Sequence, residues 1–206
     1  MKRNVLVISP HPDDESIGPG GTLRKHVERG DAVHVVFLTS GEKGGHGKSE
    51  ADTARIREAE AKAAAKVLGV KSIEFWRLPD GAIKPTPPVV KRLIATMKRL
   101  LPGVIYVPHD KEQHPDHRAA VRLVRAARPK AEVLMFEVWT PIQKIDHIED
   151  ISGQIATKLK AIRAYKCQCE AVGFPEAFEG LARYRGEMHS WPGGDYAEVF
   201  TRLKRR

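Results

Sequence analysis

Residues that stabilise secreted proteins or cross membranes are scarce in this sequence. It has 2 cysteines in 206 residues, Cys167 and Cys169, and they lie in a segment whose pattern predicts a helix. Positions two apart on a helix do not face each other, so we expect no disulfide between them. The apolar run at residues 5–8 is too short for a signal peptide, and no run approaches the ~20 apolar residues of a membrane helix. We therefore expect a cytoplasmic protein.

Acidic residues are outnumbered by basic ones, 26 to 35, which gives a formal net charge of +9. Many of the basic residues recur at helical spacing, as Arg118, Arg122 and Arg125 do, and this is typical of solvated helix faces. No motif interleaves basic with aromatic residues, so we do not expect a nucleic-acid partner. The length suits one domain over residues 1–206. The oligomeric state, including a homo-oligomer, stays open.

Short apolar runs alternate with amphipathic stretches along the chain. We expect strands over residues 4–8, 33–38, 72–76, 103–107 and 132–138, and helices over 21–29, 50–68, 89–101 and 116–127. Such alternation predicts an α/β fold with a mostly parallel sheet, for which we expect the strand order 3-2-1-4-5. Beyond residue 139 we expect late additions to the sheet: a helix near 153–169, a mixed stretch over 174–190 and a strand near 196–200.

Two motifs rich in histidine and aspartate follow two of these strands. The first spans Ser9 to Glu15 and the second spans His114 to His117. In the order 3-2-1-4-5 the first and fourth strands are neighbours, and their carboxyl ends form the topological switch point of the sheet. Both motifs should therefore direct side chains into one cleft.

The spacing within the motifs predicts a catalytic metal site. His11 and Asp14 are three apart, as are His114 and His117, so each pair can share a face of a tight turn. Two histidines, one carboxylate and an open position for water describe a catalytic zinc site. We assign His11, Asp14 and His117 as ligands of Zn²⁺, while Fe²⁺ could occupy the same donors.

The remaining residues of the motifs suit acid-base catalysis. Zinc lowers the pKa of its water to about 7, and Asp13 is placed to take the proton as the water attacks a carbonyl. Protonated His114 would stabilise the oxyanion, with Asp116 holding its imidazole in the cationic form. Either His114 or Asp13 could protonate the departing amine. Glu15 is interpreted as a supporting or helix-start residue, and His109 and Asp110 as partners of the ligating histidines.

Two other classes of function remain open at this point. The two-His, one-carboxylate set also suits a non-haem iron enzyme, which oxygen uptake would reveal. The glycine-rich loop from Gly41 to Lys48 favours a nucleotide-binding module, although it lacks the full phosphate-loop pattern. We interpret it instead as a flexible loop at the rim of the cleft.

Taken together, the motifs resemble those of a known family. These are His11-Pro12-Asp13-Asp14-Glu15 with Gly20-Gly21-Thr22-Leu23, Leu38-Thr39-Ser40-Gly41-Glu42, Arg57-Glu58-Ala59-Glu60, Leu78-Pro79-Asp80-Gly81, His114-Pro115-Asp116-His117 and Tyr196-Ala197-Glu198-Val199-Phe200. The series resembles the zinc-dependent de-N-acetylases, which include the N-acetylglucosaminyl-phosphatidylinositol deacetylases and the bacterial thiol-sugar deacetylases (PIG-L and LmbE-like proteins).

The resemblance carries expectations about fold, reaction and residues. It implies a Rossmann-like three-layer sandwich and a hydrolase that removes the N-acetyl group from an N-acetylglucosamine-type small molecule, releasing acetate and an amine. It implies the same metal ligands as the spacing, with Asp13 as base and His114 as acid or oxyanion partner. It also makes Arg57 a candidate for substrate binding. Asp80, in a Pro-Asp-Gly turn, is interpreted as structural, and Cys167 stands where the family usually has serine.

Overall fold

The computed structural model describes residues 2–189 and 194–204, and its centre is a seven-stranded sheet of order β3-β2-β1-β4-β5-β7-β6. The strands are β1 (Asn4–Ser9), β2 (Ala32–Phe37), β3 (Ser72–Phe75), β4 (Val104–Pro108), β5 (Glu132–Phe136), β6 (His147–Asp150) and β7 (Ala197–Arg202). The first five are parallel, whereas β7 runs antiparallel to both β5 and β6. The predicted order 3-2-1-4-5 is confirmed, and the late additions extend the sheet beyond β5.

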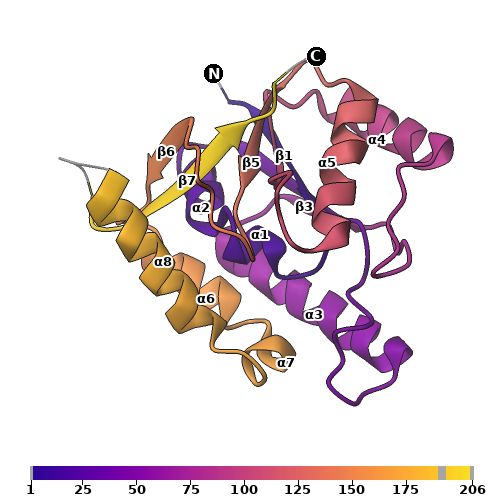
Figure 1. Ribbon diagram of the computed structural model, residues 1–206, viewed down its shortest axis with the longest axis horizontal. Coiled ribbons are helices and arrows are strands. Elements are labelled where there is room, and N and C mark those ends of the chain that lie inside the picture. The colour runs from indigo at the N-terminus through magenta and orange to yellow at the C-terminus, as the bar shows by residue number, and fades with distance from the viewer. Residues whose placement is uncertain (1, 190–193, 205–206) are drawn as a thin grey trace.

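Helices cover both faces of the sheet (Figure 1). One face carries α1 (Asp14–Ile17), α2 (Gly20–Glu28), α3 (Glu50–Leu68), α6 (Ile155–Ile162), α7 (Lys166–Cys169) and α8 (Phe174–His189). The other face carries α4 (Pro87–Leu100) and α5 (Pro115–Ala127). The predicted α/β three-layer sandwich is therefore confirmed.

The alternation of side chains along β1 explains the two cores. Val5 and Val7 point into the larger core beneath α3 and α6, while Leu6 and Ile8 point into the core beneath α4 and α5. Successive strand residues face opposite sides of a sheet, so a strand covered on both faces is apolar at every position. Burying each such side chain contributes roughly 1.5–3 kcal/mol. The strands that carry the two motifs are thus fixed by packing on both sides.

Helix ends follow local signals. The side chain of Ser49 accepts a hydrogen bond from the Asp52 amide at 3.1 Å and caps α3. Gly69 ends that helix at φ +81°, a conformation that favours glycine. The predicted helix 50–68 therefore matches α3 in both bounds. At α5, Pro115 occupies the first turn and His114 is the N-cap, so this helix begins inside the second motif.

The late part of the chain departs from the predictions. The single helix expected near 153–169 is wrong: α6 ends at Ile162, and the chain turns at the fully buried Tyr165 before α7. The stretch 174–190 forms α8 over 174–189, and residue 190 lies outside the described residues. Strand β6 was not predicted, because three partly buried residues and one exposed residue carry little alternation. The strand expected over 132–138 ends at Phe136, which frees the next residues to line a cleft.

A buried ion pair joins this late part to the first motif. Lys158 Nζ lies 2.5 Å from a carboxylate oxygen of Glu198, and both side chains are almost fully buried. The same ammonium donates at 2.7 Å to the carbonyls of Ile17 and Gly18, at the end of α1. Glu198 in turn accepts hydrogen bonds from two amides in the first turn of α2, both at 2.8 Å. The segment that follows the first motif is therefore held by fully paired charges.

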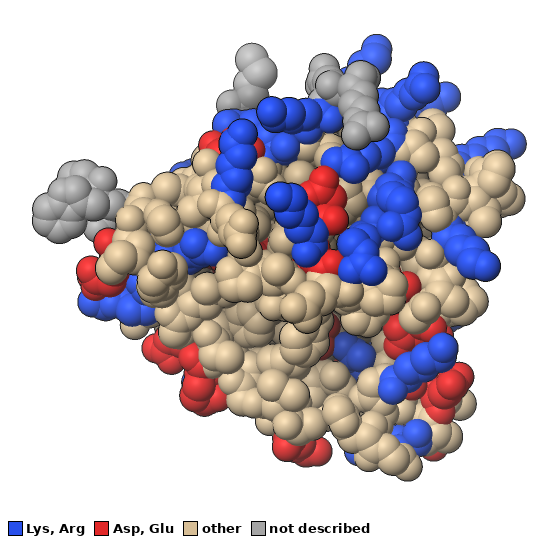
Figure 2. Space-filling view, viewed as in Figure 1, with Lys and Arg blue, Asp and Glu red and all other residues tan. Residues whose placement is uncertain are grey.

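Surface charge is unevenly spread. Figure 2 shows lysine and arginine gathered along the upper edge of the view, close to where Figure 1 places the two chain ends. Strand β1 starts near that edge, and the motif that follows it lies at its opposite end. On the face shown in Figure 2, the basic side chains therefore gather away from the strand ends that carry the motifs. Across residues 2–189 and 194–204, the structure contains no helix with the length and apolar character of a membrane span.

Candidate active site

The first motif forms a tight turn between β1 and α1. Asp13 has φ +128° and ψ −33°, a conformation that is costly for a residue with a Cβ. The turn is closed by Asp14, whose Oδ2 accepts a hydrogen bond from the His11 amide at 2.9 Å. Beneath it, Glu15 is buried and accepts hydrogen bonds from the Tyr165 hydroxyl at 2.7 Å and from the Asp13 amide at 3.2 Å. Glu15 therefore contacts the backbone of the turn that it was expected to support.

The second motif meets the first at the ends of β1 and β4. The ring centroids of His11 and His117 lie 5.4 Å apart, and those of His114 and His117 lie 5.0 Å apart. Asp14 lies between the two proposed histidine ligands: its Oδ2 is 3.2 Å from His11 Nδ1 and its Oδ1 is 3.3 Å from His117 Nε2. The three proposed ligands are therefore adjacent in space.

The donors fit a divalent metal. His117 is completely buried, yet among the described residues neither of its ring nitrogens has a partner with hydrogen-bond geometry. A buried imidazole left in this state is costly, and coordination through one nitrogen would satisfy it. Donor atoms of His11, His114 and His117 all lie within 4.8 Å of one another, as do those of His11, Asp80 and Asp116. Imidazole and carboxylate donors suit zinc, and also ferrous iron.

The pKa values of the adjacent Asp13 and Asp14 are shifted in opposite directions. Burial raises the pKa of Asp13 to about 7, although the nearby Arg57 guanidinium opposes this. Burial also acts on Asp14, but the charge of His117 and the hydrogen bond from His11 lower its pKa below the usual range. Neighbouring carboxyl groups whose pKa values are driven apart are typical of an acid-base group beside a permanently charged one.

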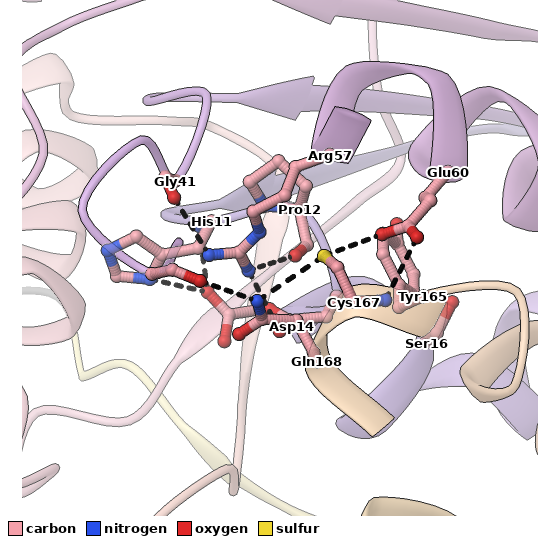
Figure 3. Close-up of polar contacts among 12 residues, drawn as sticks. His11, Pro12, Asp14, Ser16, Gly41, Arg57, Glu60, Tyr165, Cys167 and Gln168 are labelled. Carbon is pink, nitrogen blue, oxygen red and sulfur yellow. Dashed lines mark hydrogen bonds and ion pairs between the residues drawn. The ribbon is translucent and has the colours of Figure 1, made fainter. Parts of the chain in front are cut away.

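Arg57, from α3, holds the Asp13 turn. Its guanidinium donates to Asp13 Oδ2 at 2.9 Å, to the Pro12 carbonyl at 2.5 Å and to the Gly41 carbonyl at 3.0 Å. Figure 3 shows the guanidinium lying between Pro12 and Gly41. The side chain is only 5% exposed. Its donors are thus directed largely to protein acceptors that fix the strained turn.

The role expected for the Asp116 carboxylate is wrong. It accepts hydrogen bonds from the amides of Gly81 at 2.7 Å and Ile83 at 3.0 Å, and its other contact is His11 Nε2 at 3.4 Å. It is the backbone amide of Asp116 that orients His114, by donating to Nδ1 at 3.2 Å. An Nδ1 that accepts a hydrogen bond carries no proton, and burial lowers the pKa of His114. In its neutral form, the His114 imidazole would therefore carry its proton on Nε2.

Asp80 was interpreted as structural, but it reaches the site. Its Oδ1 lies 3.1 Å from His11 Nε2, and its Oδ2 accepts the Lys43 amide at 3.0 Å. Two carboxylates, Asp80 and Asp116, thus flank one nitrogen of His11, and together with Asp14 they raise the pKa of this buried histidine well above its usual value, although burial alone would lower it. The Pro-Asp-Gly pattern predicts a turn of the backbone, but it does not predict the direction of the Asp80 carboxylate.

Glu112 is a site residue that sequence reasoning missed. Its fully buried carboxylate lies 3.5 Å from His117 Nδ1 and 3.5 Å from His109 Nε2, and it accepts backbone hydrogen bonds from the segment after β5. His109 contacts Glu112 and, at 2.7 Å, the Thr140 carbonyl, so its expected link to the ligating histidines would run through Glu112. Asp110 is not a partner of the histidines, because it pairs with Arg125 on the surface at 2.7 Å. Glu112 could not be found from the sequence, because a single loop glutamate forms no regularly spaced motif with the ligand residues.

The first half of the rim loop, from Gly41 to Gly44, is anchored to the rest of the site. Its Gly41 carbonyl binds Arg57, its Lys43 amide binds Asp80, and its Gly44 carbonyl accepts a hydrogen bond from Gln168 at 2.9 Å. Cys167, next to Gln168, donates to a carboxylate oxygen of Glu60 at 2.9 Å (Figure 3). Neither cysteine forms a disulfide, as expected.

A cleft of about 290 Å³ opens onto these groups. It is lined by His11, Asp13, Asp14, Ile17, Lys43, Gly44, Arg57, Asp80, Gly81, His114, Val138, Trp139, Gln168, Phe174 and Phe178. A small cavity with convergent histidines and carboxylates at a topological switch point is the usual setting of an α/β active site. The fold and the site together define an α/β enzyme whose clustered histidines and carboxylates could hold a catalytic metal ion.

Comparisons with known proteins agree with this class. Residues 6–128 match the PIG-L family model, described as GlcNAc-PI de-N-acetylase. The diacetylchitobiose deacetylase of Thermococcus kodakarensis is 31% identical over 95% of this chain and 81% of its own length. The chain belongs to the PIG-L family, as its motifs predicted.

Solved structures share the whole fold. The N,N'-diacetylchitobiose deacetylase of Pyrococcus horikoshii superposes with a TM-score of 0.85 at 27% identity, covering 98% of this chain and 84% of that one. The 4-carboxy-2-hydroxymuconate hydratase of Pseudomonas putida KT2440 superposes with a TM-score of 0.89 at 27% identity, covering 100% and 98%. The same architecture thus carries two reactions in which water is added to a substrate.

Proposed function

We propose that this chain hydrolyses the acetamide of a small N-acetylated amino sugar, releasing acetate and a free amine, with Zn²⁺ held by His11, Asp14 and His117. The observation that carries the proposal is the convergence of Asp14 on both histidines, beside a second carboxyl group, Asp13, in a strained turn. A bound zinc ion would supply a Lewis acid that lowers the pKa of water and polarises a carbonyl oxygen.

Asp13 is the general base in this proposal. Its carboxylate takes the proton of the attacking water, because its raised pKa suits a group that must accept a proton near neutral pH. Arg57 is a positioning residue, since it fixes both the Asp13 carboxylate and the backbone of the turn. The family resemblance implies substrate binding by Arg57, whereas these contacts favour a positioning role.

His114 acts on the carbonyl oxygen, and Asp13 acts on the departing amine. Because its Nδ1 accepts the Asp116 amide, the Nε2–H is the group available to donate a hydrogen bond to the developing oxyanion. The proton that Asp13 accepts from water is then returned to the amine as the C–N bond breaks. Asp80 and Asp116 hold the imidazole of His11, and Asp116 also accepts the amide of Gly81, which lines the cleft.

An amino-sugar substrate is supported by the relatives and by the cleft. The Thermococcus and Pyrococcus relatives are named for diacetylchitobiose, and a relative in Bacillus cereus, 28% identical over 84% of this chain, is named a probable N-acetyl-α-D-glucosaminyl L-malate deacetylase. The cleft combines charged groups with an apolar wall, which suits a polar molecule with apolar faces.

The test is a screen of N-acetylglucosamine, N,N'-diacetylchitobiose and glycosides of N-acetylglucosamine with the zinc-loaded chain, in which free amine and acetate are quantified. Asp13→Asn should keep its zinc and lose at least ~100-fold in turnover, the scale expected for loss of an acid-base group. Glu132→Gln, an exposed change on β5, is the matched control. Wild-type rates in Asp13→Asn would contradict the assignment of the base.

The hydratase relative defines the competing outcome. Hydration of 4-carboxy-2-hydroxymuconate can be followed by the loss of its conjugated ultraviolet absorbance. Hydration without release of amine from any acetamide would place this chain with the hydratase and overturn the proposal.

A further inference from the structure

The cleft has an apolar wall that the proposed chemistry does not use. It consists of Ile17, Val138, Trp139, Phe174 and Phe178. Ile17 and Phe174 are almost fully buried, whereas Trp139 is 51% exposed. The wall therefore runs from a closed interior to an open aromatic surface.

Of the two tryptophans among the described residues, Trp139 is the more exposed. Trp76 packs in the core and is 5% exposed. The Trp139 ring contacts Phe174 edge-on, with centroids 5.8 Å apart and planes at 68°. An edge contact supports the indole from one side and leaves much of its surface to solvent. A large aromatic surface exposed beside a cleft is a typical ligand contact.

The backbone of Trp139 is linked through Glu112 to His117, one of the proposed metal ligands. Its amide donates to Glu112 Oε2 at 3.2 Å, and the same oxygen lies 3.5 Å from His117 Nδ1. The amides of Val138 and Thr140 on either side donate to Glu112 Oε1. One buried carboxylate thus sets the position of the aromatic surface relative to a ligating histidine, and such fixed geometry favours specific binding.

The part of the substrate that reaches Trp139 follows from the size of an acetyl group. The acetyl methyl is one bond from the carbonyl carbon that is attacked beside His11 and His117, so it stays near the interior of the cleft. A pyranose ring has a face of C–H groups and a rim of hydroxyls. An exposed indole matches the face, and Lys43 and Gln168 on the cleft lining offer polar partners for the rim.

We propose that Trp139 is the stacking platform of an outer subsite, which binds a second sugar ring linked to the N-acetylated one. This inference rests on the proposed function and narrows its substrate class to disaccharides or longer glycosides. Free N-acetylglucosamine would bind without this contact.

The test compares two substrates in Trp139→Ala. The ratio kcat/KM for N,N'-diacetylchitobiose should fall about tenfold, equivalent to about 1.4 kcal/mol, mainly through KM. The same ratio for N-acetylglucosamine should change less than about threefold. Trp139→Phe should keep most of the activity on the disaccharide, because a ring remains. Tyr184→Ala removes a 54% exposed aromatic outside the cleft and is the matched control.

An equal loss on both substrates in Trp139→Ala would overturn the inference. A loss that follows acyl length, measured with N-butyrylglucosamine, would also overturn it and would assign the wall to the acyl group. Binding provides a readout that does not need turnover. In the Asp13→Asn background, N,N'-diacetylchitobiose should change the tryptophan fluorescence of the chain, and Trp139→Phe should remove that change. The absence of any change on saturation would count against the subsite.

The two failures can be told apart. If wild-type enzyme releases no amine from any acetamide, the proposed function fails. If it hydrolyses both sugars and Trp139→Ala does not distinguish them, only the outer subsite fails.

Discussion

The contacts of Glu112 make Glu112→Gln the most informative single change. Oε1 accepts the amides of Val138 at 2.7 Å and Thr140 at 3.3 Å, and Oε2 accepts the amide of Trp139 at 3.2 Å. The carboxylate also lies 3.5 Å from His117 Nδ1. Burial would raise the pKa of Glu112, but the contact with His117 and the backbone amides lowers it, so the group is charged.

Glutamine keeps the shape of this side chain but replaces one acceptor oxygen with a donor. At least one of the backbone amides then faces an NH₂ group, which costs about 1–3 kcal/mol of folding stability for a buried unsatisfied donor. The loss of negative charge beside His117 also makes this proposed ligand less basic. Removing such a partner of a metal-binding histidine typically weakens metal affinity 10–100-fold.

Zinc affinity of Glu112→Gln can be measured by competition with a chromogenic chelator, and stability by urea denaturation. Glu132→Gln, which alters an exposed glutamate on β5, controls for the change of charge. An unchanged zinc dissociation constant in Glu112→Gln, with normal behaviour of the control, would refute the link between Glu112 and the metal ligand.

Three further predictions follow from other contacts. Arg57→Ala should lower kcat about 100-fold with zinc retained, because Asp13 loses its positioning partner; a change confined to KM would instead favour substrate binding by Arg57. Lys158→Met should destabilise the fold by about 3–5 kcal/mol in urea denaturation, because Glu198 keeps a buried charge without its cation, and adding Glu198→Gln should recover part of the loss. Contacts led by the hydrogen bond to His147 lower the pKa of Glu149 to about 2, so its stabilisation is complete above pH ~4.5 and is lost as the pH falls toward 2. Glu149→Gln should therefore lower Tm by roughly 2–4 °C at pH 7 and by progressively less below pH 4.5, whereas a difference that does not change with pH would contradict this.

The position of the site could be predicted from the sequence because parallel strands converge. The alternation of apolar and amphipathic segments placed the two motifs at the ends of neighbouring strands, and His11 and His117 indeed meet there. Spacing of three residues within each motif then indicated which side chains could face the cleft. Both inferences depend on regular geometry, which a sequence encodes locally.

The contacts of the loop carboxylates could not be predicted in this way. Asp80 and Glu112 reach the histidines only because of the irregular paths of the segments that carry them. Asp116 is close to His114 in sequence, which suggested a direct contact. Its carboxylate instead binds two backbone amides at residues 81 and 83, and such paired donors compete effectively for a single carboxylate.

The break in the late helix has a different cause. Apolar and basic residues over 153–169 fit a continuous helix, but the chain turns so that Tyr165 can enter the core and donate to Glu15. Burial of one large side chain with a satisfied hydroxyl outweighs helix propensity, which is worth less than about 1 kcal/mol per residue. Contacts between residues so far apart in the sequence cannot be predicted from the local spacing of apolar and polar residues.

The most direct test of the account is an anomalous diffraction measurement at the zinc absorption edge on crystals of the zinc-loaded chain. The account predicts one peak about 2.0–2.2 Å from a nitrogen of His11, an oxygen of Asp14 and a nitrogen of His117. A peak at the neighbouring donors of His11, Asp80 and Asp116, or no peak at full zinc loading, would contradict it.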